Sequence, residues 1–185
     1  MKQIAIFASG EGTNAQRLID YFKNSCITIN MIACNNSQAG VLNRAARTNT
    51  HLLLFNHKQF YYSDVILQKL LSEKINLIVL AGFMWKVPEN ILSAFPDKII
   101  NIHPALLPKY GGKGMYGMNV HNAVIAAKEK ESGITIHYVN EKYDEGKIIF
   151  QKKCEVSTDD TPESLSTKVH AMEYEYYPKI IEQLL

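Results

Sequence analysis

The stretch from Asn101 to Pro108 places an amide and an imidazole two residues apart, directly after a short apolar run at residues 98–100. Alternate residues of a strand point the same way, and Pro104 prevents the strand from continuing, so Asn101 and His103 are expected to face one site. The pair supplies one hydrogen-bond donor that does not titrate and one that does. Such donors can stabilise an oxyanion in acyl transfer. Taken alone, the same residues could instead cap a turn and fill a half-buried position.

A glycine-rich turn at residues 10–15 follows an apolar run and opens a helical pattern. Free backbone N–H groups at such a helix N-terminus can bind an anion. The glycine spacing is that of a dinucleotide fingerprint, but the next strand ends in Cys-Asn-Asn at residues 34–36, where a dinucleotide site needs an acidic residue for the ribose. We therefore expect a phosphate site here, or else a tight turn without a ligand. The residues expected to hold the phosphate are Gly12, Thr13 and Asn14.

Residues 81–88 bring a phenylalanine, a methionine and the sole tryptophan to the end of the apolar run at residues 77–80. This cluster could form a wall for a flat apolar ring. Ordinary core packing would account for any one of the three side chains.

Two loops could complete a site. The acidic turn at residues 140–146 presents Asp144, which could act as a base or bond its own backbone in an Asx-turn. Residues 109–117 carry four glycines and could form either a lid or a flexible crossover.

The elements that must position these residues follow an α/β pattern. Apolar runs predict strands at residues 4–8, 27–33, 51–55, 77–80 and 98–102, with helical patterns between them. This alternation predicts a doubly wound, mostly parallel open sheet with helices on both faces.

The C-terminal part is predicted to contain two more strands and a final helix. The strands are expected at residues 133–139 and 147–156, and the helix is expected to begin at Pro162. Pro178 is expected to bend or restart this helix. The buried stripe of the helix is predicted to consist of Leu165, Val169, Met172 and Tyr176.

The composition fits one domain over residues 1–185. The net charge is +2 with the lysines spread, so we expect no nucleic-acid partner. Three separated cysteines indicate no disulfide framework, and six histidines show no metal-ligand spacing, so no metal is expected. There is no signal-peptide pattern, and the longest apolar run, residues 77–85, is too short to span a bilayer. We expect a cytoplasmic protein without a membrane partner, and the sequence does not indicate its oligomeric state.

Four motifs together resemble the phosphoribosylglycinamide formyltransferase family. They are Ser9-Gly10-x-Gly12-Thr13-Asn14, Ala81-Gly82-Phe83-Met84, Asn101-x-His103-Pro104-x-Leu106-Leu107-Pro108 and Asp144-x-Gly146. The resemblance covers nearly the whole chain. It implies transfer of a formyl group from the co-substrate 10-formyltetrahydrofolate to the amine of glycinamide ribonucleotide, a step of purine synthesis.

The resemblance also implies roles for individual residues. The catalytic trio would be Asn101, His103 and Asp144. The ribonucleotide would be held by Gly12, Thr13, Asn14 and Glu173. The folate would be held by Met84, Trp85, Lys86, Val87, Asn101, Asn140, Glu141, Lys142, Tyr143 and Asp144. Asn119 and Tyr174 depart from the family pattern, because relatives often have histidine at both positions.

Three alternatives remain open at this point. The first is another formyl-folate transferase, acting on an amino sugar or on methionyl-tRNA. The second is a deformylase, which would hydrolyse the same donor without an amine acceptor. The third is a non-catalytic module that binds a phosphate-bearing ligand on a dinucleotide-type fold.

Overall fold

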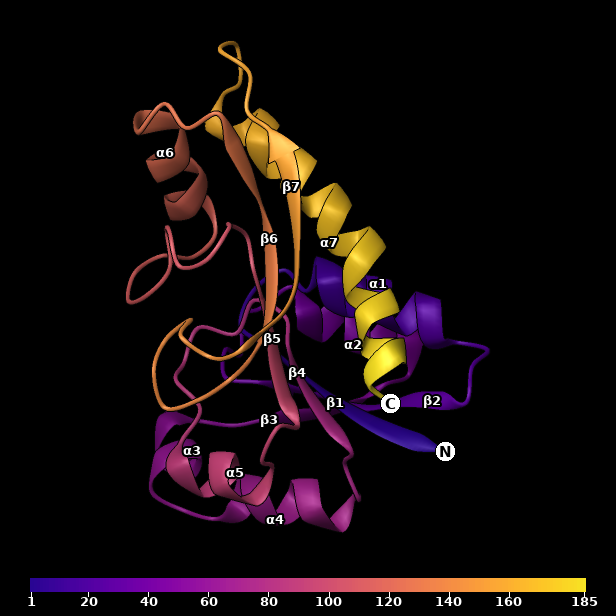
Figure 1. The fold of residues 1–185 in the computed structure, drawn as a ribbon. Helices are drawn as coiled ribbons and strands as arrows, with labels where there is room; N and C mark the ends of the chain where they lie inside the picture. The colour runs from indigo at the N-terminus through magenta and orange to yellow at the C-terminus, as the bar shows by residue number, and fades with distance from the viewer.

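A computed structural model describes all residues 1–185 and contains one sheet of seven strands in the order β3-β2-β1-β4-β5-β6-β7 (Figure 1). Strands β1 to β5 pair in parallel, while β6 pairs antiparallel with β5 and with β7. The prediction of a mostly parallel open sheet is confirmed. The strands are β1 (Lys2–Ala8), β2 (Ile27–Cys34), β3 (His51–Leu54), β4 (Leu77–Leu80), β5 (Ile99–His103), β6 (Glu131–Tyr138) and β7 (Ile148–Glu155).

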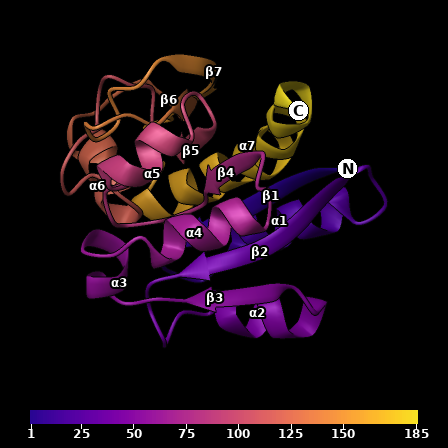
Figure 2. The same ribbon diagram turned by 90° about the horizontal axis from the view of Figure 1, so that it is seen from below.

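Helices cover both faces of the sheet, as predicted. The helices are α1 (Thr13–Phe22), α2 (Val41–Thr48), α3 (His57–Tyr61), α4 (Val65–Ser72), α5 (Glu89–Ala94), α6 (Met118–Ala126) and α7 (Pro162–Leu184). Buried side chains of α1, α2, α6 and α7 pack on one face, and those of α3, α4 and α5 pack on the other. Strands β2 and β3 lie on the side of the molecule opposite β6 and β7 (Figure 2).

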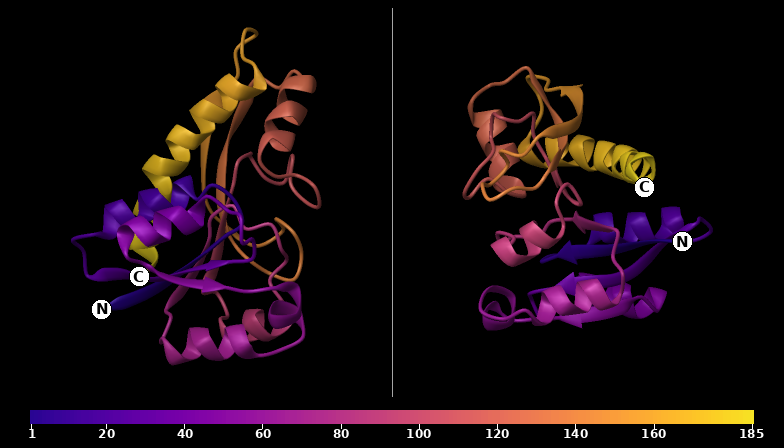
Figure 3. Two further views of the ribbon diagram at one scale, coloured as in Figure 1. Left: turned by 180° about the vertical axis from the view of Figure 1, so that it is seen from behind. Right: turned by 60° about the horizontal axis from the view of Figure 1, so that its bottom comes forward.

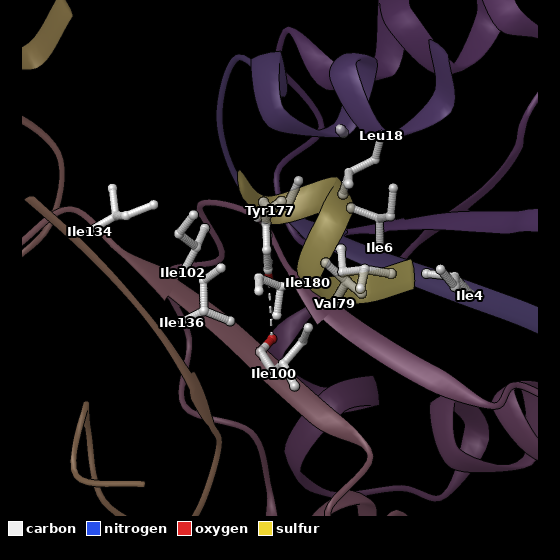
Figure 4. Close-up of a cluster of buried hydrophobic side chains, with 14 of the residues drawn as sticks. Ile4, Ile6, Leu18, Val79, Ile100, Ile102, Ile134, Ile136, Tyr177 and Ile180 are labelled. Carbon is white, nitrogen blue, oxygen red and sulfur yellow. Dashed lines mark hydrogen bonds between the residues drawn. The ribbon is translucent and has the colours of Figure 1, made fainter. Parts of the chain in front are cut away.

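The central strands are apolar along their whole length because they are buried on both faces. In β1, Ile4 and Ile6 belong to one core cluster, whereas Ala5 and Phe7 belong to the other. The first cluster brings side chains of β1, β4, β5 and β6 against α1 and α7 (Figure 4).

Helix α7 crosses one face of the sheet, from its start near α6 to the C-terminus beside α1 (Figure 3). The predicted buried stripe is correct for Leu165 and Val169 but wrong further along, where Glu173 and Tyr177 are buried and Met172 and Tyr176 are only partly covered. The helix also continues through Pro178 without restarting.

The position of Tyr177 explains which face of α7 is buried. Its ring is fully buried, and its hydroxyl donates to the carbonyl of Leu80 at 2.9 Å. The hydroxyl also lies 3.4 Å from the carbonyl of Ile100, the contact drawn as a dashed line in Figure 4. This side chain links α7 to the last residue of β4 and to the second residue of β5. The same rotation of the helix directs Glu173, one turn earlier, toward the carboxyl edge of the sheet.

The strand order places a crevice at one edge of the sheet. Strand β1 lies between β2 and β4, and the helices that follow β1 and β3 pack on opposite faces. In open α/β sheets, ligands bind at such a switch point, outside the carboxyl ends of the strands. The glycine turn after β1 and the aromatic segment after β4 both lie there. No helix of the chain is long and apolar enough to cross a membrane.

Candidate functional site

A cavity of about 730 Å³ opens at the carboxyl edge of the sheet. Its lining comes from the turns after β1, β4 and β5, from the turn between β6 and β7, and from α6 and α7. The cavity therefore gathers segments that are far apart in the sequence.

Nearly all of the predicted site residues line this cavity. They are Gly12, Thr13, Asn14, Met84, Trp85, Lys86, Val87, Asn101, His103, Asn140, Lys142, Tyr143, Asp144 and Glu173. Glu141 is exposed and is not among the lining residues, so the structure does not bring its side chain into the cavity.

The amide, imidazole and carboxylate that the sequence singled out meet in one place. The carboxylate of Asp144 lies 3.6 Å from His103 Nδ1 and 3.5 Å from Asn101 Nδ2. Asp144 Oδ2 also accepts a hydrogen bond of 2.9 Å from the backbone N–H of Gly112. Of the two sequence interpretations of Asp144, the structure supports a carboxylate directed into the site rather than an Asx-turn.

His137 holds the Asn101 amide in a defined orientation, and the sequence reasoning missed this residue. In the pairing of β5 with β6, His137 lies directly opposite Asn101. Its Nδ1 lies 2.8 Å from the carbonyl of Tyr138, so in the neutral ring Nδ1 carries the proton and Nε2 is an acceptor. Asn101 Nδ2 donates to that Nε2 at 3.1 Å. The second N–H of Asn101 has only the long contact of 3.5 Å with Asp144 Oδ1, which a substrate oxygen in the site could replace.

His103 is buried and is anchored through one nitrogen. Its Nε2 donates to the carbonyl of Tyr110 at 2.7 Å, so Nδ1 faces Asp144. Burial lowers the pKa of His103 below its ordinary value, although the Asp144 charge and the Tyr110 carbonyl act to raise it. The cost of burying the imidazolium therefore outweighs the effect of the Asp144 carboxylate on this pKa.

Asp144 stays ionised despite its burial. Burial acts to raise its pKa, but contacts with His137, the charge of His103 and the N–H of Gly112 lower the pKa below its usual value. The site thus pairs a carboxylate that holds its charge with an imidazole that is readily neutral.

The glycine turn after β1 forms the other end of the cavity. Gly12 precedes α1 in the left-handed conformation, with a φ of 71°, and a Cβ there would collide with Val41. This position therefore requires glycine. No side chain caps the N-terminus of α1, so its backbone N–H groups remain available for an anion.

Glu173 faces this turn from α7. Asn14 Nδ2 donates to Glu173 Oε2 at 2.8 Å, so one N–H of the Asn14 amide is engaged by the carboxyl group. Burial raises the pKa of Glu173 to about 7, against the bond from Asn14. Near neutral pH this carboxyl group can bind a ligand as a donor or as an acceptor.

The aromatic segment after β4 forms the opposite wall. Val87 is buried and Met84 is 47% exposed, and both line the cavity. The Trp85 ring packs against Phe55, Phe60 and Tyr61 behind the wall. These side chains thus pack into the core and also line the cavity, and their contact with a flat apolar ring stays a prediction.

The glycine-rich segment at residues 112–117 borders the cavity. Asn119, at the first departure from the family pattern, donates to the carbonyl of Gly114 at 3.0 Å and so braces this segment. Tyr174, the second departure, stacks on His170 with ring centroids 6.0 Å apart.

Two further histidines of the cavity carried no signal in the sequence. His121 of α6 and His170 of α7 both line the cavity, with ring centroids 6.5 Å apart. Burial lowers the pKa of His121 to about 4, with His170 and His103 adding to the effect. No three His, Cys, Asp or Glu side chains are grouped closely enough to hold a metal ion.

The sequence and the fold of this chain are similar to those of known proteins. Residues 2–181 match the family described as formyl transferase. The chain is 36% identical to phosphoribosylglycinamide formyltransferase of Bacillus subtilis, over all of this chain and 95% of that protein. It is 34% identical to the chloroplastic phosphoribosylglycinamide formyltransferase of Arabidopsis thaliana, over 97% of this chain, and it spans only 64% of that protein.

A solved structure agrees with the sequence comparison. The fold superposes on glycinamide ribonucleotide transformylase 1 from Geobacillus kaustophilus with a TM-score of 0.90. The two chains are 35% identical, and the match covers all of this chain and 99% of the other.

Proposed function

Because the chain belongs to the formyl transferase family, and within it to the phosphoribosylglycinamide formyltransferases, we propose that it moves a formyl group from 10-formyltetrahydrofolate to glycinamide ribonucleotide. The observation that carries this proposal is the convergence of Asn101, His103 and Asp144 in one cavity that the glycine turn after β1 also lines. The products are formylglycinamide ribonucleotide and tetrahydrofolate.

The reaction requires a bond exchange at one carbon. The amine of the ribonucleotide attacks the formyl carbon to form a C–N bond, and the bond from that carbon to the folate nitrogen breaks. The amine loses a proton and the folate nitrogen gains one, so the reaction needs no external acid or base overall.

Asn101 is placed to stabilise the tetrahedral intermediate. One N–H of its amide is held by His137, and the other can donate to the oxygen that becomes negative. A single donor of this kind is typically worth about 3 kcal/mol in the transition state. Since His137 fixes the amide before the substrates bind, little reorganisation is needed.

His103 and Asp144 are placed to assist the transfer of the amine proton. The free His103 ring is readily neutral, but a negative charge developing on the formyl oxygen favours the charged ring. His103 can therefore take up the amine proton at Nδ1 as the intermediate forms and give it back when the folate nitrogen leaves. Asp144 keeps its charge, so it can orient a water molecule that carries the amine proton toward the folate nitrogen.

The two ends of the cavity suit the two substrates. The phosphate would bind the backbone N–H groups at Gly12 and Thr13, and Glu173 would hold the ribose or the amine end. The pterin ring would lie against Met84, Trp85 and Val87, with backbone groups of residues 140–144 at its polar edge. We further propose a cytoplasmic location, in keeping with three unpaired cysteines.

An absorbance assay separates this function from its rivals. The purified chain is mixed with 10-formyltetrahydrofolate, with and without glycinamide ribonucleotide. Turnover that requires both compounds supports the transferase, and turnover with the folate alone would indicate a deformylase. Thermal stabilisation by the ribonucleotide without turnover would indicate a binding module.

A further inference from the structure

The segment Pro104–Pro108 joins two groups that set the geometry of His103. His103 ends β5 immediately before this segment, and the Tyr110 carbonyl that holds His103 Nε2 follows shortly after it. The segment is enclosed, since Ala105 is fully buried and Leu107 is 6% exposed. None of its backbone groups takes part in a backbone–backbone hydrogen bond outside the helices and strands. The hydrogen bonds that hold its buried backbone groups must therefore come from side chains.

Two side chains of the antiparallel strands supply those bonds. The Thr135 hydroxyl of β6 donates to the Ala105 carbonyl at 2.6 Å and accepts from the Leu107 N–H at 3.0 Å. Gln151 Nε2 of β7 donates to the Leu107 carbonyl and to the Thr135 hydroxyl, both at 2.9 Å. Together the two side chains satisfy three backbone groups of the segment.

The Thr135 hydroxyl lies at the centre of this network, and all of its hydrogen-bonding positions are used. A hydroxyl group has one donor and two acceptor positions, and all three are used at Thr135, which is fully buried. A buried polar network whose members are all satisfied is rigid, whereas an unpaired buried group is costly. Removing this hydroxyl would leave the Ala105 carbonyl and the Leu107 N–H without partners.

The strand register connects this network to the site. In the antiparallel pairing, Thr135 lies opposite His103, just as His137 lies opposite Asn101. Thr135 and His137 are two residues apart, so both point to the same face of β6. Strand β6 thus supports both catalytic side chains of β5, one directly and the other through the segment that follows it.

We propose that Thr135 and Gln151 are positioning residues for His103, which act by fixing the Pro104–Pro108 segment and with it the Tyr110 carbonyl. Neither residue lines the cavity, so neither is expected to touch the substrates. The inference rests on the proposed formyl transfer, since that reaction is its readout.

Two variants test the role of the Thr135 hydroxyl. Thr135→Val keeps the shape of the side chain and removes the oxygen, whereas Thr135→Ser keeps the oxygen. We expect the valine variant to lose about tenfold in kcat while KM for the ribonucleotide changes less than about threefold, because a small displacement of a catalytic group mainly affects the chemical step. The serine variant should recover kcat to within about threefold of the wild type.

The pH dependence of kcat is a second measurement, which general destabilisation of the fold would not change. His103 is faced by Asp144, His137 and His121 and by the Tyr110 carbonyl, and that carbonyl raises its pKa. A looser Tyr110 contact in Thr135→Val should move the alkaline decline of kcat to lower pH by about half a unit. An unchanged kcat and pH profile in the valine variant, or an equal loss in the serine variant, would overturn the inference.

A variant of Gln151 tests the inference even if Thr135→Val does not fold. Gln151 is an exposed residue whose amide turns inward, so Gln151→Met should fold, lower kcat about threefold and shift the pH profile in the same direction. The control is Lys153→Met on the same strand, where an exposed pair with Glu131 is lost and no change is expected. Equal activity of the two variants would argue against the inference, and a wild type without transfer would instead refute the proposed function.

Discussion

The Asn101 amide has two N–H groups, and only one of them is engaged by His137. We predict that Asn101→Ala lowers kcat by about 100- to 1,000-fold, in line with the loss of one oxyanion donor. The measurement is steady-state turnover, with a melting curve to show that the variant is folded. Asn90→Ala, which changes an asparagine outside the cavity that donates to Asp64, is the control and should keep full activity. Near wild-type turnover of Asn101→Ala would remove Asn101 from the proposed role.

The second prediction concerns how the ionisation of Glu173 changes the stability of the protein with pH. Burial raises its pKa from 4.5 to about 7, so the neutral form is favoured by folding. The stability contributed by the neutral carboxyl group is complete below pH 4.5 and is lost as the pH rises through about 7. Glu173→Gln removes this dependence. The stability of the variant relative to the wild type should therefore increase by about 2 kcal/mol between about pH 5.5 and about pH 8.

Urea denaturation of the two proteins at both pH values measures this difference, because titration of all other groups is common to both. A stability difference that does not vary with pH would show that Glu173 titrates in its ordinary range.

Residue types and spacing predicted most of the site, but not the contacts between strands. Asn101, His103 and Asp144 were found because their motifs are local. His137 and Thr135 lie on a strand whose register against β5 cannot be read from the sequence, and that register determines which side chains meet. The burial that lowers the pKa of His103 likewise depends on Tyr110 and the segments around it.

Among the elements, the turn between β6 and β7 depends on one glycine. A Cβ on Gly146 would overlap the backbone carbonyl of Tyr138 and lie 3.4 Å from His137 Nδ1. Because backbone rather than a flexible side chain is in the way, Gly146→Ala should displace the turn that carries Asp144. We predict a loss of about 2 kcal/mol in stability and at least about tenfold in kcat.

Urea denaturation and turnover measure the effect of Gly146→Ala. Gly114→Ala is the control for stability, since its Cβ would enter open space and only the φ of 88° would cost about 1 kcal/mol. Wild-type stability and turnover of Gly146→Ala would contradict this account of the turn.

The sequence predicted all seven strands. The central strands are buried and form continuous apolar runs with clear ends, whereas the edge strands β3 and β7 are largely exposed. The short helix α3 was not predicted, since five residues show no periodicity and its capping box of Asn56 with Gln59 is the only signal. The stripe of α7 was assigned one residue early because Glu173 is acidic and was not counted as a buried position. Its burial among apolar residues depends on the contact with Asn14.

At the scale of the whole molecule, the cavity joins segments from both halves of the sheet, so a ligand that fills it should stabilise the fold. At about 100 times its Kd, a ligand adds about 2.7 kcal/mol, which corresponds to about 5 to 10 °C in Tm for a chain of this size. We predict this increase for glycinamide ribonucleotide in a thermal melt. Glycinamide without the ribose phosphate should give a much smaller increase, and equal effects of the two compounds would argue against the phosphate site.

The proposed reaction requires an amine and a formyl carbon to meet the side chains of Asn101, His103 and Asp144 at the carboxyl edge of the sheet. A crystal structure with glycinamide ribonucleotide and a folate analogue that cannot transfer its formyl group measures this arrangement directly. We expect the phosphate at the turn before α1, the pterin ring against Met84 and Val87, and the amine within about 3.5 Å of the formyl position. Ligands bound elsewhere, or an amine directed away from Asn101, would contradict the account.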